Sequence, residues 1–141
     1  MRILALDLGS KRVGVAVSDS LGLTAQGLTV LKRQPAHQLI SVIASILEQY
    51  DVDEIVVGYP KNMNGTIGPR GREAEAFAEQ LRNRFRLPVV LWDERLTTAA
   101  AERSLLEADL SRKKRRQVVD QLAAVLILEG YLQARGAKND G

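Results

Sequence analysis

Three acidic residues occupy positions where a carboxylate is costly. Asp7 interrupts an apolar, strand-like run, Glu94 ends a second apolar strand, and Asp120 lies one turn into an apolar helical segment. A buried carboxylate needs a partner, and carboxylates that converge repel one another unless a cation joins them. Sites made only of oxygen ligands suit Mg²⁺ or Mn²⁺, which can activate water and stabilise the leaving oxygen of a phosphodiester. The joint placement of the three acids therefore predicts a divalent-metal site.

Each acid also has a purely structural interpretation. Asp7 is able to cap the turn that follows it. Glu94 can pair with Arg95 or cap a following helix, and Asp120 can be an acid favoured in the first turn of its helix. Asp93 is an alternative to Glu94 as a ligand, because successive strand residues point to opposite faces.

Other chemistries find less support. The segment 7–14 combines a carboxylate, two glycines and a lysine, a set able to hold a nucleotide phosphate through backbone N–H groups. It does not match the phosphate-binding P-loop pattern and it precedes a strand rather than a helix. The chain has no cysteine and one histidine, His37, at the start of an amphipathic helix. These counts exclude a disulfide framework, thiolate metal sites and a cysteine nucleophile, and they argue against zinc.

The positive charge is concentrated in one short run. The chain has 20 basic and 17 acidic residues and a net charge of +3. Five consecutive positive charges come from Arg112, Lys113, Lys114, Arg115 and Arg116, so the remainder of the chain is net negative. Such a run favours a polyanionic partner, because each neutralised phosphate releases counterions. The alternative interpretation is a solvated, mobile loop.

The periodicity of apolar residues predicts an α/β fold. Short apolar runs predict strands, and apolar residues spaced by three and four predict helices. The first strands are close enough to form a hairpin, whereas strands linked through helices favour right-handed parallel crossovers. We therefore expect a mixed five-stranded sheet, three antiparallel strands and then two parallel ones, flanked by helices. The predicted strands are 3–8, 13–17, 27–30, 55–58 and 89–92, and the predicted helices are 35–50, 70–86, 97–108 and 117–134.

The length of 141 residues suits one domain. We expect this domain to span 1–135 and to be followed by a flexible tail over 136–141. No apolar run approaches the roughly 20 residues that a membrane span needs, and the first residues lead directly into a strand rather than a secretion signal. The expected protein is soluble and cytoplasmic, does not bind membranes, and is a monomer or a homodimer.

Four segments resemble the blocks of the YqgF family, also called RuvX, in the same order across most of the chain. They are LDLGSKRVGVAVSD at 6–19, VGYPKNMNGT at 57–66, DERLTT at 93–98 and DQLAAVLIL at 120–128. The resemblance implies a ribonuclease H-like fold related to the Holliday junction resolvase RuvC. It also implies a nuclease that acts on the 5′ end of pre-16S ribosomal RNA.

The resemblance also assigns roles to individual residues. Asp7, Glu94 and Asp120 match the metal-binding acids of the family, and Lys11 and Arg95 match the basic positions beside them. Resolvases of the RuvC type carry an acid near the end of the fourth strand, where this sequence has Gly58, Tyr59 and Pro60. The resemblance implies that Glu94 substitutes for that acid from the neighbouring strand.

These observations predict a nuclease that uses Mg²⁺ or Mn²⁺ to cut structured nucleic acid, with RNA favoured over DNA. Lys11 and Arg95 are expected to steady the scissile phosphate, and the basic run 112–116 is expected to engage the flanking backbone. Alternatives are a Holliday junction resolvase that acts on branched DNA, and a non-catalytic RNA-binding factor of ribosome assembly or transcription. A nucleotide-binding module of the actin and sugar-kinase type needs two lobes, and this chain has the length of one.

Overall fold

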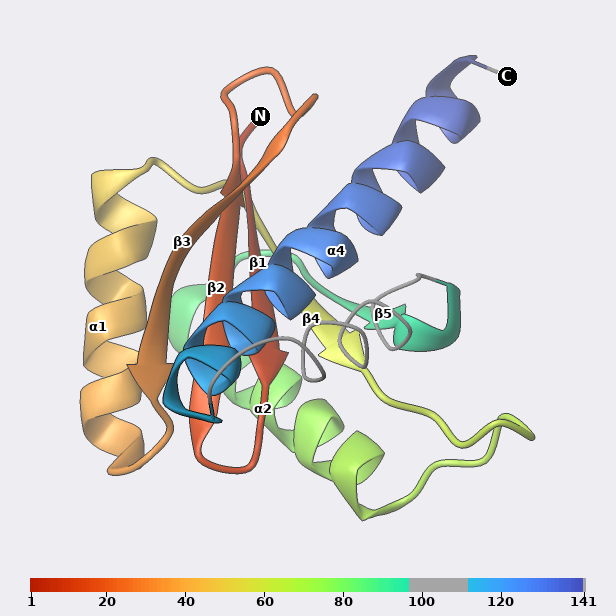
Figure 1. Cartoon of the computed structure of the whole chain (residues 1–141). Coiled ribbons are helices and arrows are strands. Elements are labelled where there is room, and N and C mark those ends of the chain that lie inside the picture. Colours follow the sequence, from red (N-terminus) through yellow and green to blue (C-terminus); the bar gives the residue numbers. More distant parts are fainter. Residues whose placement is uncertain (97–111, 141) are drawn as a thin grey trace.

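Five strands form one mixed sheet in the computed structural model of the chain (Figure 1), in the order β3-β2-β1-β4-β5. Strands β1, β2 and β3 pair antiparallel with one another, and β4 and β5 continue the sheet on the other side of β1, parallel to it. The predicted arrangement of three antiparallel and two parallel strands is therefore confirmed. The strands are β1 (Ile3–Leu8), β2 (Arg12–Ser18), β3 (Ala25–Lys32), β4 (Glu54–Tyr59) and β5 (Val89–Asp93).

The structure describes residues 1–96 and 112–140, with side chains described over 1–96 and 119–136. The helix predicted over 97–108 therefore lies outside the described residues. In the described part no helix is long and apolar enough to cross a membrane. The helices are α1 (Ala36–Gln49), α2 (Pro69–Phe85), the short 3-10 helix η1 (Glu94–Leu96) and α4 (Arg112–Asp140).

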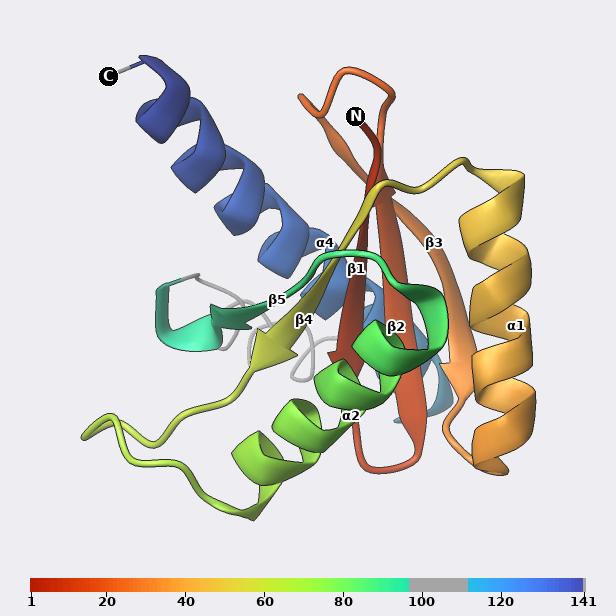
Figure 2. The same cartoon turned by 180° about the vertical axis from the view of Figure 1, so that it is seen from behind.

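Helices α1 and α2 cover one face of the sheet (Figure 2). Every second residue of β1 and β2 points to this face, where leucine and valine side chains meet apolar residues spaced by three and four along the helices. Burial of this apolar surface stabilises the sheet at roughly 25 cal/mol per Å². The helical residues buried there are Leu39, Ile40, Ile43, Ile46, Leu47, Ala74, Phe77, Ala78 and Leu81.

Helix α4 covers the opposite face and crosses β1, β2 and β3 (Figure 1). It buries a second, smaller apolar cluster that includes Ile127, Leu128 and Tyr131 against small strand residues such as Ala5 and Ala16. Because the strand residues on this face are small, α4 lies close to the sheet. Residues of the sheet that point to this face therefore sit directly beneath the helix.

The two elements that differ most in length from the prediction are β3 and α4. Strand β3 extends over Ala25–Lys32 rather than 27–30 because its backbone pairs along β2, although its side chains lack a clear apolar alternation. Helix α4 begins at Arg112 rather than at 117, so the basic run forms its first turns instead of a loop. Arginine, lysine and glutamine are good helix formers, and this propensity outweighs the repulsion between like charges. The helix also continues to Asp140 through the predicted tail.

A buried acid secures the second half of α4. Glu54 on β4 is 7% exposed, accepts a hydrogen bond from Tyr131 Oη at 2.9 Å and pairs with Arg135 Nη1 at 2.5 Å. Burial, followed by the hydrogen bond to Glu54, raises the pKa of Tyr131 above its ordinary value of 10.0. Trp92 packs edge-on against Tyr131, with ring centroids 5.8 Å apart. These contacts place α4 over the first residues of β1 and β4.

Candidate active site

Asp7 lies on the α4 face, near the end of the central strand β1, and is 8% exposed. It shares this face with Ile3 and Ala5 because side chains alternate along a strand. Its partner across the β1–β2 pair is Gly14, and the register between β1 and β4 places Gly58 at the same level on the other side. A glycine on each side leaves the space around the Asp7 carboxylate open to side chains and backbone from other elements.

Gly14 brings α4 into direct contact with the sheet. A Cβ atom on Gly14 would collide with the carbonyl oxygen of Asp120, so only glycine permits this approach. Asp120 thereby lies over the strand next to Asp7, more than two turns into α4 rather than in its first turn. Its carboxylate lies 3.7 Å from Arg12 Nη1, on the same strand as Gly14. The interpretation of Asp120 as a first-turn acid is therefore wrong, because the helix begins earlier than predicted.

Gly58 makes room for Glu94. A Cβ atom on Gly58 would lie 3.0 Å from Glu94 Oε1 and 2.6 Å from Ile127 Cδ1 of α4. The Glu94 carboxylate therefore lies on the α4 face, in the space that a side chain at position 58 would fill. Glu94 directly follows β5, and its role in place of an acid on β4 stays a prediction.

The three acids thus approach one region of the α4 face from three elements: β1, the end of β5 and α4. Their donor atoms are all carboxylate oxygens, the ligand chemistry that suits Mg²⁺ or Mn²⁺. Among the described side chains, no group of three or more His, Cys, Asp or Glu residues is close enough to hold a metal ion. The donor chemistry fits a hard divalent cation, whereas closure around such an ion requires the carboxylates to move closer together. Mutual repulsion opposes that movement when no cation is bound.

Asp93 belongs to a different set of contacts. Its carboxylate accepts hydrogen bonds from Arg95 Nη2 at 2.8 Å and Arg95 Nε at 3.1 Å, and it lies 3.9 Å from Lys61 Nζ. The hydrogen bonds from Arg95 lower the pKa of Asp93 below its ordinary value of 3.8. Asp93 shares the α2 side of β5 with Leu91, so the two neighbouring acids Asp93 and Glu94 divide between the two faces of the sheet.

The predicted substrate-binding residues lie in different places. Lys11 is exposed in the β1–β2 hairpin and, with Arg12 and Asp120, lines a hollow of about 360 Å³. Arg95 is held by Asp93 and also donates to the carbonyl of Met63 at 3.3 Å. The backbone of the basic run 112–116 lies in the first turns of α4, on the same helix as Asp120, and its side chains lie outside the described set.

Three residues shape the site beyond those predicted to act in it: the glycines Gly14 and Gly58, and Arg12, which pairs with Asp120. Gly14 lies inside the strand-like run 13–17, and a glycine inside a strand often marks a close approach of another backbone. That signal was available for Gly14 and Gly58. Nothing in the sequence indicated a contact between Arg12 and Asp120, which are more than 100 residues apart.

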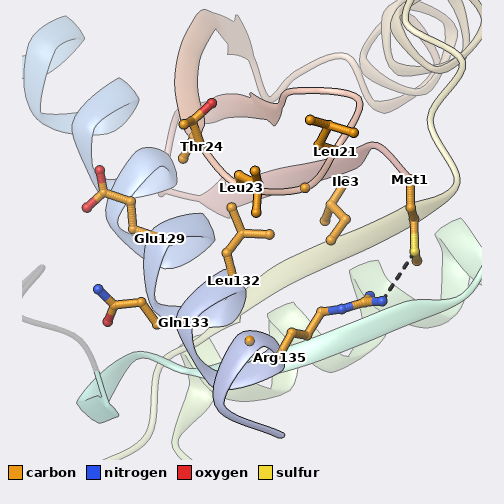
Figure 3. A pocket seen from close by; sticks show the side chains of 12 residues that line it. Met1, Ile3, Leu21, Leu23, Thr24, Glu129, Leu132, Gln133 and Arg135 are labelled. Carbon is orange, nitrogen blue, oxygen red and sulfur yellow. Dashed lines mark hydrogen bonds between the residues drawn. The ribbon is translucent and has the colours of Figure 1, made fainter. Parts of the chain in front are cut away.

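A further cavity lies away from these acids. It measures about 510 Å³ and lies between the β2–β3 turn and the second half of α4, at the opposite end of β1 from Asp7 (Figure 3). Leu21 and Leu23 line it and are 74% and 71% exposed. Arg135 spans its floor and donates to the sulfur of Met1 at 3.2 Å. The cavity contains no part of the acidic site.

Solved structures define the fold class. RuvC from T. thermophilus, in complex with a Holliday junction substrate, superposes with a TM-score of 0.58 at 15% identity and covers 96% of each chain. The Holliday junction resolvase of fowlpox virus has a TM-score of 0.54 at 18% identity and covers 96% of this chain and 99% of its own. The chain therefore has the ribonuclease H-like fold of these resolvases, as predicted.

Sequence relatives define the family. A family model described as "RuvX: Holliday junction resolvase" matches residues 1–134. A Bacillus cytotoxicus protein named "Putative pre-16S rRNA nuclease" is 57% identical over 137 residues, covering 96% of this chain and all of the relative. A Desulfitobacterium hafniense protein of the same name is 55% identical over 139 residues, covering 99% of this chain and 96% of the relative. The chain belongs to the RuvX family.

Proposed function

We propose that this protein is a metal-dependent nuclease that hydrolyses phosphodiester bonds during maturation of the 5′ end of pre-16S ribosomal RNA. One observation carries the proposal: the Glu94 carboxylate fills the space above Gly58 and thereby joins Asp7 and Asp120 on one face of the sheet. The names of the relatives support ribosomal RNA as the substrate. The proposal includes a cytoplasmic location and a single domain over residues 1–135.

The carboxylates serve as ligands in this proposal. Asp7 supplies oxygen atoms from the central strand β1, which is hydrogen-bonded on both sides. Glu94 and Asp120 complete the ligand set from β5 and α4. Bound Mg²⁺ or Mn²⁺ supplies an activated water and stabilises the charge that develops on the leaving oxygen.

Basic side chains orient the nucleic acid. Lys11 stands exposed at the rim of the hollow that Asp120 lines, so its ammonium group can meet a phosphate that enters from solvent. Arg12, 3.7 Å from the Asp120 carboxylate, holds this acid in position and offsets part of the repulsion from the other two. The basic run 112–116 adds positive charge to the start of the same helix. Neutralising that run should weaken binding and flatten its salt dependence.

The decisive experiment is cleavage of three labelled substrates with Mg²⁺ and with Mn²⁺: a 5′ segment of pre-16S ribosomal RNA, a four-way DNA junction and a plain duplex. Asp7→Asn and Asp120→Asn proteins are assayed beside the wild type. Glu79→Gln is the matched control, because it neutralises an exposed acid that pairs only with Arg82 on the surface of α2 among the contacts described. We expect the RNA to be cut by the wild type and by the control and not by the other two variants.

Two results would redirect the proposal. Symmetric cutting of the junction in preference to the RNA would indicate a resolvase that acts as a dimer, the activity named in the family description. Binding of RNA without any cleavage would indicate a non-catalytic factor. Cleavage that survives both substitutions would show that the site is elsewhere.

A further inference from the structure

The loop 60–68, which joins β4 to α2, contains a turn shaped by its own hydrogen bonds. The N–H of Asn62 donates to the carbonyl of Thr66 at 2.9 Å, and the N–H of Gly65 donates to the carbonyl of Asn62 at 2.8 Å. Gly65 has a φ of 87°, in the left-handed region that favours glycine. Met63, between these residues, is 93% exposed. The turn is therefore ordered by its own backbone while it presents an apolar side chain to solvent.

Asp93 fastens this turn to the end of β5. Its carboxylate receives two N–H groups of the Arg95 guanidinium, and the remaining Nη1 of Arg95 donates to the carbonyl of Met63 at 3.3 Å. The same carboxylate lies 3.9 Å from Lys61, at the start of the loop. The side chain of Asp93 is 15% exposed, so these contacts are partly shielded from water. One acid thus reaches both the base and the tip of the loop.

The contacts of Asp93 suit a residue that positions the loop 60–68 rather than one that binds a metal ion. An arginine that meets a carboxylate through two parallel hydrogen bonds has a fixed orientation, which a lysine or a single contact does not provide. Asp93 also faces the opposite side of the strand from the Glu94 carboxylate. The loop begins directly after β4, two residues beyond Gly58, and it extends away from the sheet on the side where β5 ends (Figures 1 and 2), so it starts at the edge of the sheet where Asp7 and Glu94 lie.

We propose that Asp93 is a positioning residue that holds the loop 60–68 beside the active site, so that Met63 contacts a base of the nucleic acid strand being cut. This inference rests on the proposed nuclease function. A methionine side chain is apolar, flexible and polarizable, and exposed apolar side chains are used as wedges against base steps in nucleic acid complexes. Lys61 adds a positive charge at the base of the loop for the phosphate backbone of the same strand.

The test compares Asp93→Asn with the surface control Glu79→Gln, because each removes one negative charge. Asparagine keeps the size of Asp93 but turns one oxygen into a donor that faces Arg95. Hydrogen exchange is measured at the amides of Asn62 and Gly65, which report on the turn without any need for activity. We expect exchange at least about tenfold faster in Asp93→Asn and unchanged in the control, since opening of the loop no longer breaks the Asp93–Arg95 contact.

RNA assays give a second, independent result. Asp93→Asn leaves Arg95 and Lys61 without their counter-charge, so we expect RNA binding at low salt to be as tight as in the wild type or tighter. We expect cleavage to be about tenfold slower, because the strand is misplaced. A variant that had merely lost stability would show weaker RNA binding as well as slower cleavage. The rise in melting temperature on adding Mn²⁺ should match the wild type, and its loss would make Asp93 a ligand and overturn the proposal.

The contact at the tip is tested with Met63→Ala, which leaves the Asp93–Arg95 pair intact. We expect wild-type hydrogen exchange in the loop and about tenfold weaker RNA binding. Unchanged binding would overturn the contact with the base. Unchanged loop exchange in Asp93→Asn would overturn the positioning role even if the wild type cuts RNA. If the wild type cuts nothing while the loop loosens as expected, the nuclease assignment fails and the anchoring by Asp93 stands.

Discussion

The α4 face of the sheet buries one acid near each end, Glu54 and Asp7. The two acids differ in the groups that surround them. At the end formed by the first residues of β1 and β4, Glu54 is enclosed by Tyr131 and Arg135, both from α4. At the other end, Asp7 lies between two glycines, and further carboxylates approach it from β5 and α4. Glu54 is 7% exposed and Asp7 is 8% exposed, so burial alone does not distinguish them.

The difference lies in the charge of the neighbours. Glu54 is compensated by a cation and a hydroxyl group, so it stabilises the docking of α4. Asp7 shares its end of the face with the carboxylates of Glu94 and Asp120, and with Arg12 beside Asp120. Carboxylates that approach one another favour the binding of a divalent cation. The face therefore combines an end that holds the helix with an end that we propose carries out the chemistry.

Gly14→Ala should have the largest effect on stability. The new methyl group would meet the backbone carbonyl of Asp120, which cannot rotate away as a side chain can. Overpacking of this kind typically costs 1–3 kcal/mol, and we expect about 3 kcal/mol because the obstacle is backbone. The measurement is urea denaturation. Gly136→Ala on the same helix is the control: no atom lies within 4 Å of its added carbon, so it should be neutral or stabilising.

Glu54→Gln and Asp7→Asn should show opposite patterns. We expect Glu54→Gln to lower the free energy of unfolding by about 2 kcal/mol and to leave cleavage unchanged. This loss is smaller than for a fully buried pair, because the Arg135 side chain is 35% exposed. Asp7→Asn should change stability little and reduce cleavage at least about a hundredfold. Denaturation and cleavage assays on both variants check this, and a large loss of stability in Asp7→Asn would contradict the comparison.

A divalent ion should stabilise the wild type by binding at the end of the α4 face where Asp7 lies, and not at the Glu54 end. At a concentration of Mg²⁺ or Mn²⁺ ten times its Kd, linkage adds about 1.4 kcal/mol to the free energy of unfolding. Thermal melts measured with and without the ion should show this shift in the wild type and in Glu54→Gln. The shift should be smaller in Asp7→Asn. Equal shifts in all three proteins would place the ion elsewhere.

Gly58→Ala should affect activity more than stability. Its methyl group would meet the far ends of the Glu94 and Ile127 side chains, which can move aside. We expect a cost of about 1 kcal/mol in stability. Displacement of the Glu94 carboxylate should reduce cleavage about tenfold. The change in stability is measured by denaturation and the change in cleavage rate by an assay on the same preparation. An unchanged cleavage rate would contradict a role for Glu94 in the site.

The smallest expected effect is a loosening of the β2–β3 turn at acid pH, caused by protonation of Asp19. Backbone N–H groups of Thr24 and Leu23 lower the pKa of Asp19 below its ordinary value of 3.8. A carboxylate with a lowered pKa in the folded state contributes stability above its unfolded pKa, and this contribution is lost as the pH falls through the folded value. We expect the β2–β3 turn to loosen only below about pH 3.8. Amide signals of Leu23 and Thr24 followed by NMR would show the transition, and Asp19→Asn would lack it.

Much of the fold could be predicted from the sequence because apolar periodicity records which side of an element is buried. The apolar stripe of α1 and the alternation in β2 belong to this class. The edge strand β3 was predicted too short because only one side of it pairs, so its side chains carry a weak pattern. The first turns of α4 were missed because charge and helix propensity give opposing signals in the run 112–116.

The candidate site was predictable in its acids and not in its geometry. Asp7, Glu94 and Asp120 stand out because a carboxylate in an apolar segment is costly wherever the chain folds. The choice between Asp93 and Glu94 depends on how β5 ends and on where Arg95 turns, and these are properties of the folded chain. The same is true of Arg12, which meets Asp120 only after α4 has packed on β2.

By itself, the sequence determined the strands and helices, the concentration of basic charge and the acids available for chemistry, because each of these depends on neighbours along the chain. The tertiary structure alone decided which acid would hold α4 and which would join a cluster. That outcome depends on the glycines at positions 14 and 58. The absence of a side chain at a glycine matters only when the fold packs another element against that glycine. Here Gly14 leaves space for Asp120 on one side of Asp7, and Gly58 leaves space for Glu94 on the other.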